Sequence, residues 1–466
     1  MNFFVPDLTL LNGRFERGLA VVCDKSGFII DVAASDETDR ASVEEAIRLT
    51  NRALLPGLIN AHSHAFQRVI RGRTEHRTRN EKDSFWTWRE MMYSAATRLT
   101  PEDIYDASRM AFLEMALTGI TAVGEFHYLH RAPDGSEYDD ANLLAKQVLR
   151  AATDVGLRIA LLRVAYARSG YEHEPNPQQA RFIEPNAELY LKHLQQLRSD
   201  LAEFSGRAWV SVAPHSVRAV PLDYLREIIR YAHDEDLPTH MHVAEQPAEI
   251  SACIQEYGLS PVALLASEGL LNERFTAVHA IHVTPKAVQA LAEARAMVCA
   301  CPTTERNLGD GVVPADLLFE HGLRISLGSD SHVQIDLLED ARELEYHLRM
   351  QKLERAVLSP EEDDSRSALA ARLFDCATVN GAASIGAPAG TLAASRPADF
   401  FTVDLDDPSI AGASEDDLLA AIVFGLSRTA VQDVVVAGRQ IVSDGRHKDQ
   451  DEIVGRFIQL QRKLWS

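Results

Sequence analysis

The stretch ALLPGLINAHSHAFQR, residues 53–68, joins an apolar run to two histidines that stand one residue apart. In an extended chain the side chains at i and i+2 point to the same side, so a strand here projects His62 and His64 together. Two such imidazoles can hold a metal ion. Taken alone, the pair is more often two ordinary polar residues at a strand end, so the rest of the chain has to decide.

The same pattern, an apolar strand that ends in polar residues, recurs between residues 56 and 387. Helical segments alternate with these strands; one of them, residues 100–119, has Thr100 at its expected cap and Gly119 at its stop. Eight candidate strands follow this rule: ALLPGLINAHSH (53–64), TAVGEFHY (121–128), RIALLRVAY (158–166), AWVSVAPHS (208–216), PTHMHVAE (238–245), TAVHAIHV (276–283), AMVCACP (296–302) and RISLGSDSH (324–332).

Strand and helix in alternation predict an α/β fold with a parallel sheet. Polar residues at the carboxyl ends of eight strands favour a (β/α)8 TIM-like barrel, which builds its active site at that end. A doubly wound sheet is the alternative, but it would not gather residues from so many strand ends.

The two termini have a different sequence pattern, in which short runs of alternating apolar and polar residues are separated by many turn residues. Residues 1–55 and 388–447 are therefore expected to combine into one small β-sandwich domain. Residues 56–387 form the barrel in this interpretation, and residues 448–466 form a closing helix.

The net charge and the cysteine content limit the kinds of molecule and compartment expected for this chain. The formal net charge of −21 disfavours nucleic acid and anionic membranes, which bind basic faces, and leaves a small molecule as the expected partner. The five cysteines are scattered without a CxxC pair, as expected for reduced thiols in the cytoplasm. Neither a signal peptide nor a run of 18 apolar residues is visible in the sequence, so no membrane association is expected.

If the chain is a barrel, its strand ends bring together a set of residues suited to metal chemistry. Three imidazoles and one carboxylate, from His62, His64, His242 and Asp330, fit Zn²⁺ or a similar divalent ion and leave room for a water molecule. Each of these residues has an ordinary alternative, since a lone histidine can be a packing residue and Asp330 can cap a helix. Together, in this order along the strands, they favour a metal site.

This order of residues resembles the amidohydrolase superfamily of metal-dependent hydrolases and deaminases, and the resemblance spans nearly the whole chain. Members with two metals carry a lysine on the fourth strand, whereas AWVSVAPHSVRAV (208–220) has none, so one divalent metal per chain is expected. Zn²⁺ is the expected ion, although iron and manganese also fit such a site. The spacing of His242 and Glu245 is similar to that of the mononuclear deaminases, in which this glutamate is the proton shuttle.

Longer blocks resemble one family within that group, the formimidoylglutamate deiminases: NAHSHAFQR, DSFWTWREMMY, EFHYLHRAPDG, HSVRAV, HVAEQ, TTERNLGDG and GSDSHV. The resemblance implies hydrolysis of N-formimino-L-glutamate to N-formyl-L-glutamate and ammonia, a step of histidine degradation. It implies catalytic roles for Glu245, His279 and Asp330. Homodimerisation is suggested by the resemblance alone. The substrate-binding residues that it implies are Gln67, Arg89, Tyr128, His215 and Arg218.

The chemistry of the residues agrees with that expectation. Hydrolysis of an amidine needs a nucleophile at neutral pH, and a metal ion can lower the pKa of bound water to about 7. It also needs a proton for the departing nitrogen, a general-acid role for Glu245. The two substrate carboxylates call for arginines, and Arg89 and Arg218 are expected in loops after barrel strands.

Two other functions stay open. A deaminase of another substrate, such as an aminated purine or related heterocycle, would use nearly the same metal machinery, but a neutral ring does not require two arginines. A relative without activity would show gaps in the ligand set, and the sequence has none.

Overall fold

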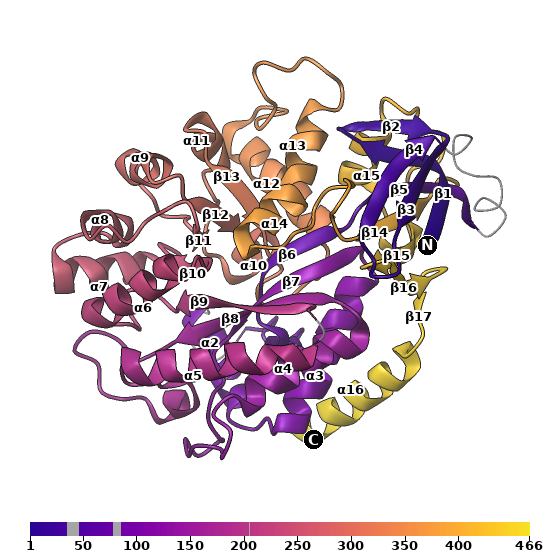
Figure 1. The fold of residues 1–466 in the computed structure, drawn as a ribbon. Helices are drawn as coiled ribbons and strands as arrows, with labels where there is room; N and C mark the ends of the chain where they lie inside the picture. Colours follow the sequence, from indigo (N-terminus) through magenta and orange to yellow (C-terminus); the bar gives the residue numbers. More distant parts are fainter. Residues whose placement is uncertain (35–45, 78–84, 205) are drawn as a thin grey trace.

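The protein was analysed as a computed structural model that describes residues 1–34, 46–77, 85–204 and 206–466. At its centre, eight parallel strands form one sheet in the order β13-β12-β11-β10-β9-β8-β7-β6, and helices lie around its outside (Figure 1). The eight expected strands are confirmed. They are β6 (Leu58–Ser63), β7 (Ile120–His127), β8 (Arg158–Ala165), β9 (Ala208–Pro214), β10 (Thr239–Val243), β11 (Phe275–His279), β12 (Met297–Ala300) and β13 (Arg324–Leu327).

The first and last strands of this sheet meet and nearly close it into a barrel. The His64 amide donates to the Asp330 carbonyl at 3.1 Å, and the Asp330 amide donates to the His62 carbonyl at 3.0 Å. A Cβ at Gly328 would lie 2.7 Å from the Cβ of His62, so only glycine allows this close approach. The barrel, and not a doubly wound sheet, is the fold.

The segment expected as one strand at 53–64 is divided at Gly57. β5 (Ile47–Pro56) pairs with the terminal strands, while β6 begins the barrel at Leu58. A Cβ at position 57 would lie 2.2 Å from the Thr121 hydroxyl oxygen. The chain therefore passes from one sheet to the other at a residue that has no side chain.

The two termini combine as expected, in a mixed sheet of nine strands in which β5 lies between β1 and β14 (Figure 1). Residues 35–45 of the first expected part lie outside the described residues. We propose that 1–55 and 388–447 form one domain beside the barrel of 56–387 and the helix of 448–466. The strands of this sheet are β1 (Asn2–Leu11), β2 (Arg14–Arg17), β3 (Leu19–Cys23), β4 (Ile29–Ala34), β5, β14 (Phe400–Asp404), β15 (Val431–Val436), β16 (Arg439–Ser443) and β17 (Arg446–His447).

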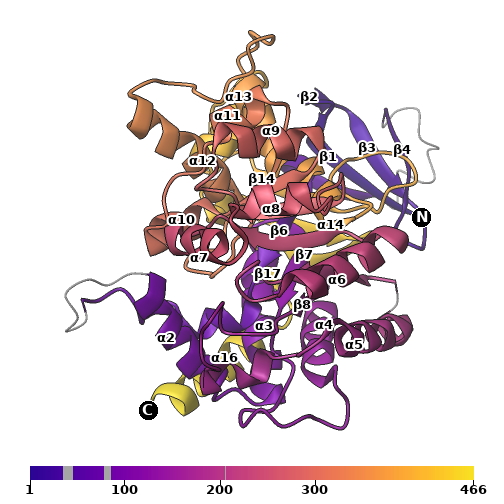
Figure 2. The same ribbon diagram turned by 90° about the vertical axis from the view of Figure 1, so that its left-hand side faces the viewer.

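The helix expected at 100–119 is α3 (Pro101–Ala116). Thr100 caps it in a capping box with Asp103, and Gly119, at φ +85°, lies in the turn that follows. The closing helix is α16 (Gln450–Trp465), which runs beside α3 in Figure 2 and is tied to it by an ion pair of 2.8 Å between Arg456 and Asp106.

The remaining helices lie mostly in the connections between barrel strands. In the described residues, no helix is both long and apolar enough to cross a bilayer. The α-helices are α2 (Phe85–Ala96), α4 (Leu143–Val155), α5 (Ala187–Asp200), α6 (Leu222–Asp234), α7 (Pro247–Tyr257), α8 (Pro261–Ser267), α9 (Pro285–Glu293), α10 (Pro302–Leu308), α11 (Ala315–Glu320), α12 (Leu337–Lys352), α13 (Ala368–Ala377), α14 (Val379–Ile385) and α15 (Leu418–Gly425). Short 3₁₀ segments are η1 (Ala65–Ile70), η2 (Pro177–Phe182), η3 (Leu201–Phe204) and η4 (Arg428–Ala430).

Candidate metal centre and active site

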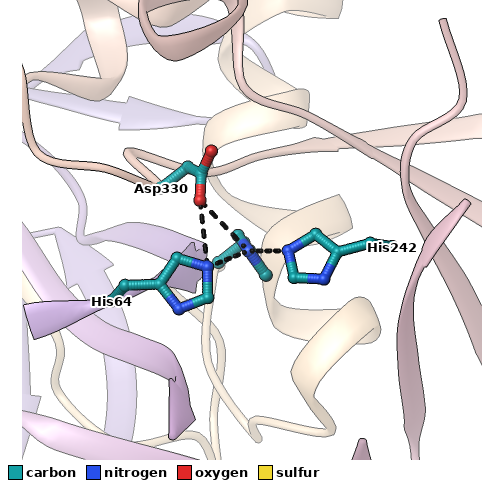
Figure 3. A group of neighbouring side chains, drawn as sticks. His64, His242 and Asp330 are labelled. Carbon is teal, nitrogen blue, oxygen red and sulfur yellow. Dashed lines mark hydrogen bonds and ion pairs between the residues drawn. The ribbon is translucent and has the colours of Figure 1, made fainter. Parts of the chain in front are cut away.

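Four side chains that could hold a metal ion converge at the carboxyl end of the barrel: His62, His64, His242 and Asp330. The Nε2 atom of His62 lies 3.1 Å from Nε2 of His64 and 3.2 Å from Nε2 of His242. The Asp330 Oδ1 atom lies 3.4 Å from the His62 nitrogen and 3.1 Å from that of His64. Figure 3 shows His64, His242 and Asp330 directed toward a common centre.

The outer ring nitrogens of two of these histidines contact backbone carbonyls. Nδ1 of His64 lies 2.9 Å from the Phe126 carbonyl oxygen, and Nδ1 of His242 lies 3.1 Å from that of His215. A carbonyl only accepts, so each Nδ1 carries the proton and each Nε2 presents a lone pair to the centre. Burial lowers the pKa of His62 to about 3 and keeps the pKa of His242 well below its usual value, so these rings are neutral.

The spacing of the donors fits one ion. Zn²⁺ bonds of about 2.0–2.1 Å place neighbouring ligand atoms about 2.9–3.3 Å apart, close to the 3.1–3.4 Å of the four contacts given above. Although burial favours the protonated acid, the close contacts with His62 and His64 hold the pKa of Asp330 well below its usual value. Three lone pairs and a carboxylate in such proximity are suited to a divalent cation.

A second group of metal-type residues, His279, Cys301 and Glu305, lies nearby and is explained by hydrogen bonds. Glu305 Oε1 accepts the Cys301 amide at 2.8 Å and lies 3.2 Å from Nδ1 of His279. The strand β9 contains no lysine that could bridge two ions. A single ion per chain therefore stays the prediction.

Glu245 and His279, the predicted proton carriers, lie beside this centre. His279 Nε2 is 3.7 Å from Glu245 Oε1 and 3.9 Å from Asp330 Oδ2. Burial raises the pKa of Glu245, and His279 keeps a raised pKa despite its burial because Glu245 and Glu305 face it. His279 and Asp330 have φ of +72° and +45°, strained conformations of the kind that cluster at functional sites.

One pocket is lined by three of the four donors, His64, His242 and Asp330, and by both proton carriers. All five predicted substrate-binding residues also line it: Gln67, Arg89, Tyr128, His215 and Arg218. The Gln67 amide donates to the Tyr128 hydroxyl at 2.8 Å, whereas its Oε1 has no hydrogen-bond partner in the described part of the chain. A buried acceptor of this kind is suited to a substrate N–H group.

These observations agree with comparisons to known proteins. The sequence pattern of the Amidohydrolase family matches residues 53–441. The chain belongs to the amidohydrolase family. It is a hydrolase, and the predicted relationship is confirmed.

Several known proteins are similar to this amidohydrolase over most of its length. It is 40% identical to a formimidoylglutamate deiminase from Pseudomonas aeruginosa, with 100% of both chains covered. It is 25% identical to a 5-methylthioadenosine/S-adenosylhomocysteine deaminase from Haloarcula marismortui, over 94% of this chain and 90% of that protein. The crystal structure of an amidohydrolase from Brucella melitensis matches with a TM-score of 0.91 and 33% identity, with 100% of both chains covered.

The expected position of Arg89 was wrong in one respect, because this amidohydrolase carries it on helix α2 and not in an irregular loop. The residue is 8% exposed, so it is not a surface arginine. Its guanidinium nevertheless stacks on Trp86 at 5.4 Å and on Tyr93 at 5.1 Å.

Arg218 lies, as expected, in the connection after β9, where its Nη1 donates to the Ser169 carbonyl at 2.7 Å. The DSFWTWREMMY block that contains Arg89 begins at residues 83 and 84, which lie outside the described residues.

Sequence reasoning missed several residues of this site. Glu305 orients His279, and Glu249 accepts the amides of Ala244 and Glu245 at 3.2 and 3.1 Å. Tyr166, at the carboxyl end of the third barrel strand, contacts both predicted arginines. Its place in RIALLRVAY, after the apolar run, was the signal that could have found it.

Proposed function

We propose that this amidohydrolase hydrolyses N-formimino-L-glutamate to N-formyl-L-glutamate and ammonia with one divalent metal ion, Zn²⁺ by the choice of donors. The observation that carries the proposal is the pairing of Arg89 and Arg218 in one pocket with the metal-type donors. Two guanidinium groups match a substrate with two carboxylates. The 40% identity to a formimidoylglutamate deiminase supports the same substrate.

Each predicted residue has a chemical task in this reaction. A divalent ion held by His62, His64, His242 and Asp330 would supply a nucleophile by acidifying water. Asp330 would accept the proton that the attacking water loses, and His279, whose pKa is raised, would hold the water in position by donating a hydrogen bond.

Glu245 then carries a proton to the terminal nitrogen of the formimino group. Burial raises its pKa, which favours the protonated form that a general acid needs. The carbon–nitrogen bond to that terminal nitrogen breaks, ammonia leaves, and the formyl oxygen comes from water.

The alternative is deamination of an aminated purine or a related heterocycle. The relatives named as 5-methylthioadenosine/S-adenosylhomocysteine deaminases, at 25% identity, favour it. Two arginines around one pocket disfavour it, because a neutral ring offers no carboxylate to pair with them. A relative without activity is disfavoured by the complete set of donors and proton carriers.

An ammonia-release assay on the Zn²⁺-loaded protein tests the proposal, with formiminoglutamate beside 5′-methylthioadenosine, adenosine, guanine and small amidines. We expect formiminoglutamate to have the highest kcat/KM by at least about tenfold. A purine nucleoside preferred over formiminoglutamate would refute the assigned substrate and leave the metal site in place.

The metabolic pathway, the cellular compartment and the oligomeric state are part of the same proposal. Release of ammonia from formiminoglutamate is a step of histidine degradation, which we place in the cytoplasm. All five cysteines are free and buried, in keeping with a reducing compartment. A homodimer remains part of the proposal, and the molecular mass in solution tests it.

A further inference from the structure

The hydroxyl oxygen of Tyr166 is a meeting point of three donors from different parts of the chain. Arg89 Nη2 on α2 lies 3.1 Å away, Gln179 Nε2 on η2 lies 3.1 Å away, and Arg218 Nη1 after β9 lies 3.5 Å away. The ring of Tyr166 also meets the ring of His215 edge-on, with centroids 4.7 Å apart. One side chain thus contacts three of the five predicted substrate-binding residues.

Tyr166 lies behind the side chains that line the pocket. It is 1% exposed and is not among the residues that line the pocket, whereas both arginines are. Any effect of its hydroxyl on binding must therefore pass through Arg89 and Arg218.

The surroundings hold this oxygen in place. Gln179 also donates to the Tyr93 hydroxyl at 2.6 Å, and Arg181 in the same segment donates to the Leu99 carbonyl at 2.9 Å, just beyond α2. Two guanidinium groups in one pocket repel each other, and an acceptor shared between them offsets part of that repulsion. Burial alone would raise the pKa of Tyr166, but the charges of Arg218 and Arg89 lower it.

We propose that Tyr166 is a positioning residue that holds Arg89 and Arg218 at a fixed spacing, so that the pocket selects ligands with two carboxylates. The inference rests on the proposed function for the identity of the substrate. The carboxylates are remote from the reacting carbon, so their contacts contribute about equally to substrate and transition-state binding. Loss of the spacing should therefore raise KM and leave kcat nearly unchanged.

The test is Tyr166→Phe, which keeps the ring and removes the oxygen. We expect KM for formiminoglutamate to rise about 10-fold to 100-fold, with kcat within about threefold of the parent and metal content unchanged. In an Arg218→Met background the same change should alter KM less than threefold, because one of the two arginines is already gone. Full additivity of the two changes would show that Tyr166 does not act through Arg218, and would overturn the proposal.

A matched control separates positioning from folding. Tyr190→Phe removes another buried hydroxyl, which donates to the Arg163 carbonyl at 2.7 Å. Neither Tyr190 nor Arg163 lines the pocket. We expect it to lower the melting temperature and leave KM unchanged. If Tyr166→Phe fails to fold, Gln179→Met replaces it and should raise KM in the same direction by a smaller factor.

A binding measurement tests this inference separately from the proposed function. N-formyl-L-glutamate is titrated calorimetrically into parent and Tyr166→Phe, beside N-formyl-4-aminobutyrate, which has one carboxylate. The variant should lose about 10-fold or more in affinity for the dicarboxylate and clearly less for the monocarboxylate. Equal losses for both ligands, or no loss, would overturn the inference. A parent that binds the dicarboxylate but does not hydrolyse formiminoglutamate would refute the proposed function alone.

Discussion

Replacing Arg218 by methionine removes one of the two positive charges that face the substrate pocket. Methionine keeps an unbranched stem, so the packing of the loop after β9 changes little. The change breaks the hydrogen bond of 2.7 Å from Nη1 to the Ser169 carbonyl, and it also ends the contact with Tyr166. In the proposed complex, it leaves one substrate carboxylate without its partner.

The magnitude follows from the energy of such a contact. A hydrogen bond to a charged group contributes about 1.5–3 kcal/mol. Each 1.4 kcal/mol is about a tenfold change, so kcat/KM should fall about 10-fold to 150-fold. Arg218 is half-buried, and a carboxylate left unpaired in its place carries a desolvation cost. That cost extends the expected loss to about 1,000-fold.

The assay is steady-state ammonia release with formiminoglutamate, with metal content measured on the same samples. Arg226→Met is the matched control, since Arg226 on α6 pairs with Glu268 at 2.6 Å outside the pocket lining, and it should keep the parent kcat/KM. Arg89→Met should behave like Arg218→Met. If both pocket variants hydrolyse formiminoglutamate as fast as the parent, the assignment of the two carboxylates to these arginines is wrong.

Metal analysis of the active protein should find about one equivalent per chain, and His242→Ala should lower both occupancy and turnover; two tightly bound equivalents would contradict the single-ion prediction. Glu245→Gln should keep metal and substrate binding while kcat falls about 10²-fold to 10⁴-fold. Near-normal turnover in this variant would exclude Glu245 as proton carrier. His279→Asn should also reduce kcat. Burial raises the pKa of Glu249 from 4.5 to about 7. The folded protein therefore holds the Glu249 proton more tightly than the unfolded chain does. The free energy of unfolding that this adds is complete below about pH 4.5 and is lost as the pH rises through about 7. Glu249→Gln should make the free energy of unfolding in urea less pH-dependent between pH 5 and pH 8, by about 2 kcal/mol, and an unchanged pH dependence would count against this assignment.

The barrel and its metal-type donors could be predicted from the sequence because they follow a local rule. Each donor stands at or just after the end of an apolar strand, and parallel strands bring their carboxyl ends to one edge. His62, His242 and Asp330 are far apart in sequence, yet the strand order alone was enough to place them together.

The residues that support the site follow no local rule. Glu305 reaches His279 from the start of α10, and Gln179 reaches Tyr166 from a 3₁₀ segment after β8. Such contacts depend on how connecting segments pack on one another, which the periodicity of a sequence does not record. The passage from β5 to β6 at Gly57 was missed for a similar reason, since it is set by the contact with Thr121.

The seam between β6 and β13 has a consequence for the lifetime of the protein. Within the described residues the two strands meet through an isolated bridge between Ser63 and Asp330. The donors His62 and His64 lie on one side of that seam and Asp330 on the other, so an ion bound by all of them also joins the first strand to the last. Because binding to the closed form disfavours opening, free metal concentration should govern how often the barrel opens there. A chelator is then expected to speed amide hydrogen exchange at residues 60–64 and 328–332 before the opposite strands, and a metal-starved cell would lose this enzyme to proteolysis as well as to inactivity.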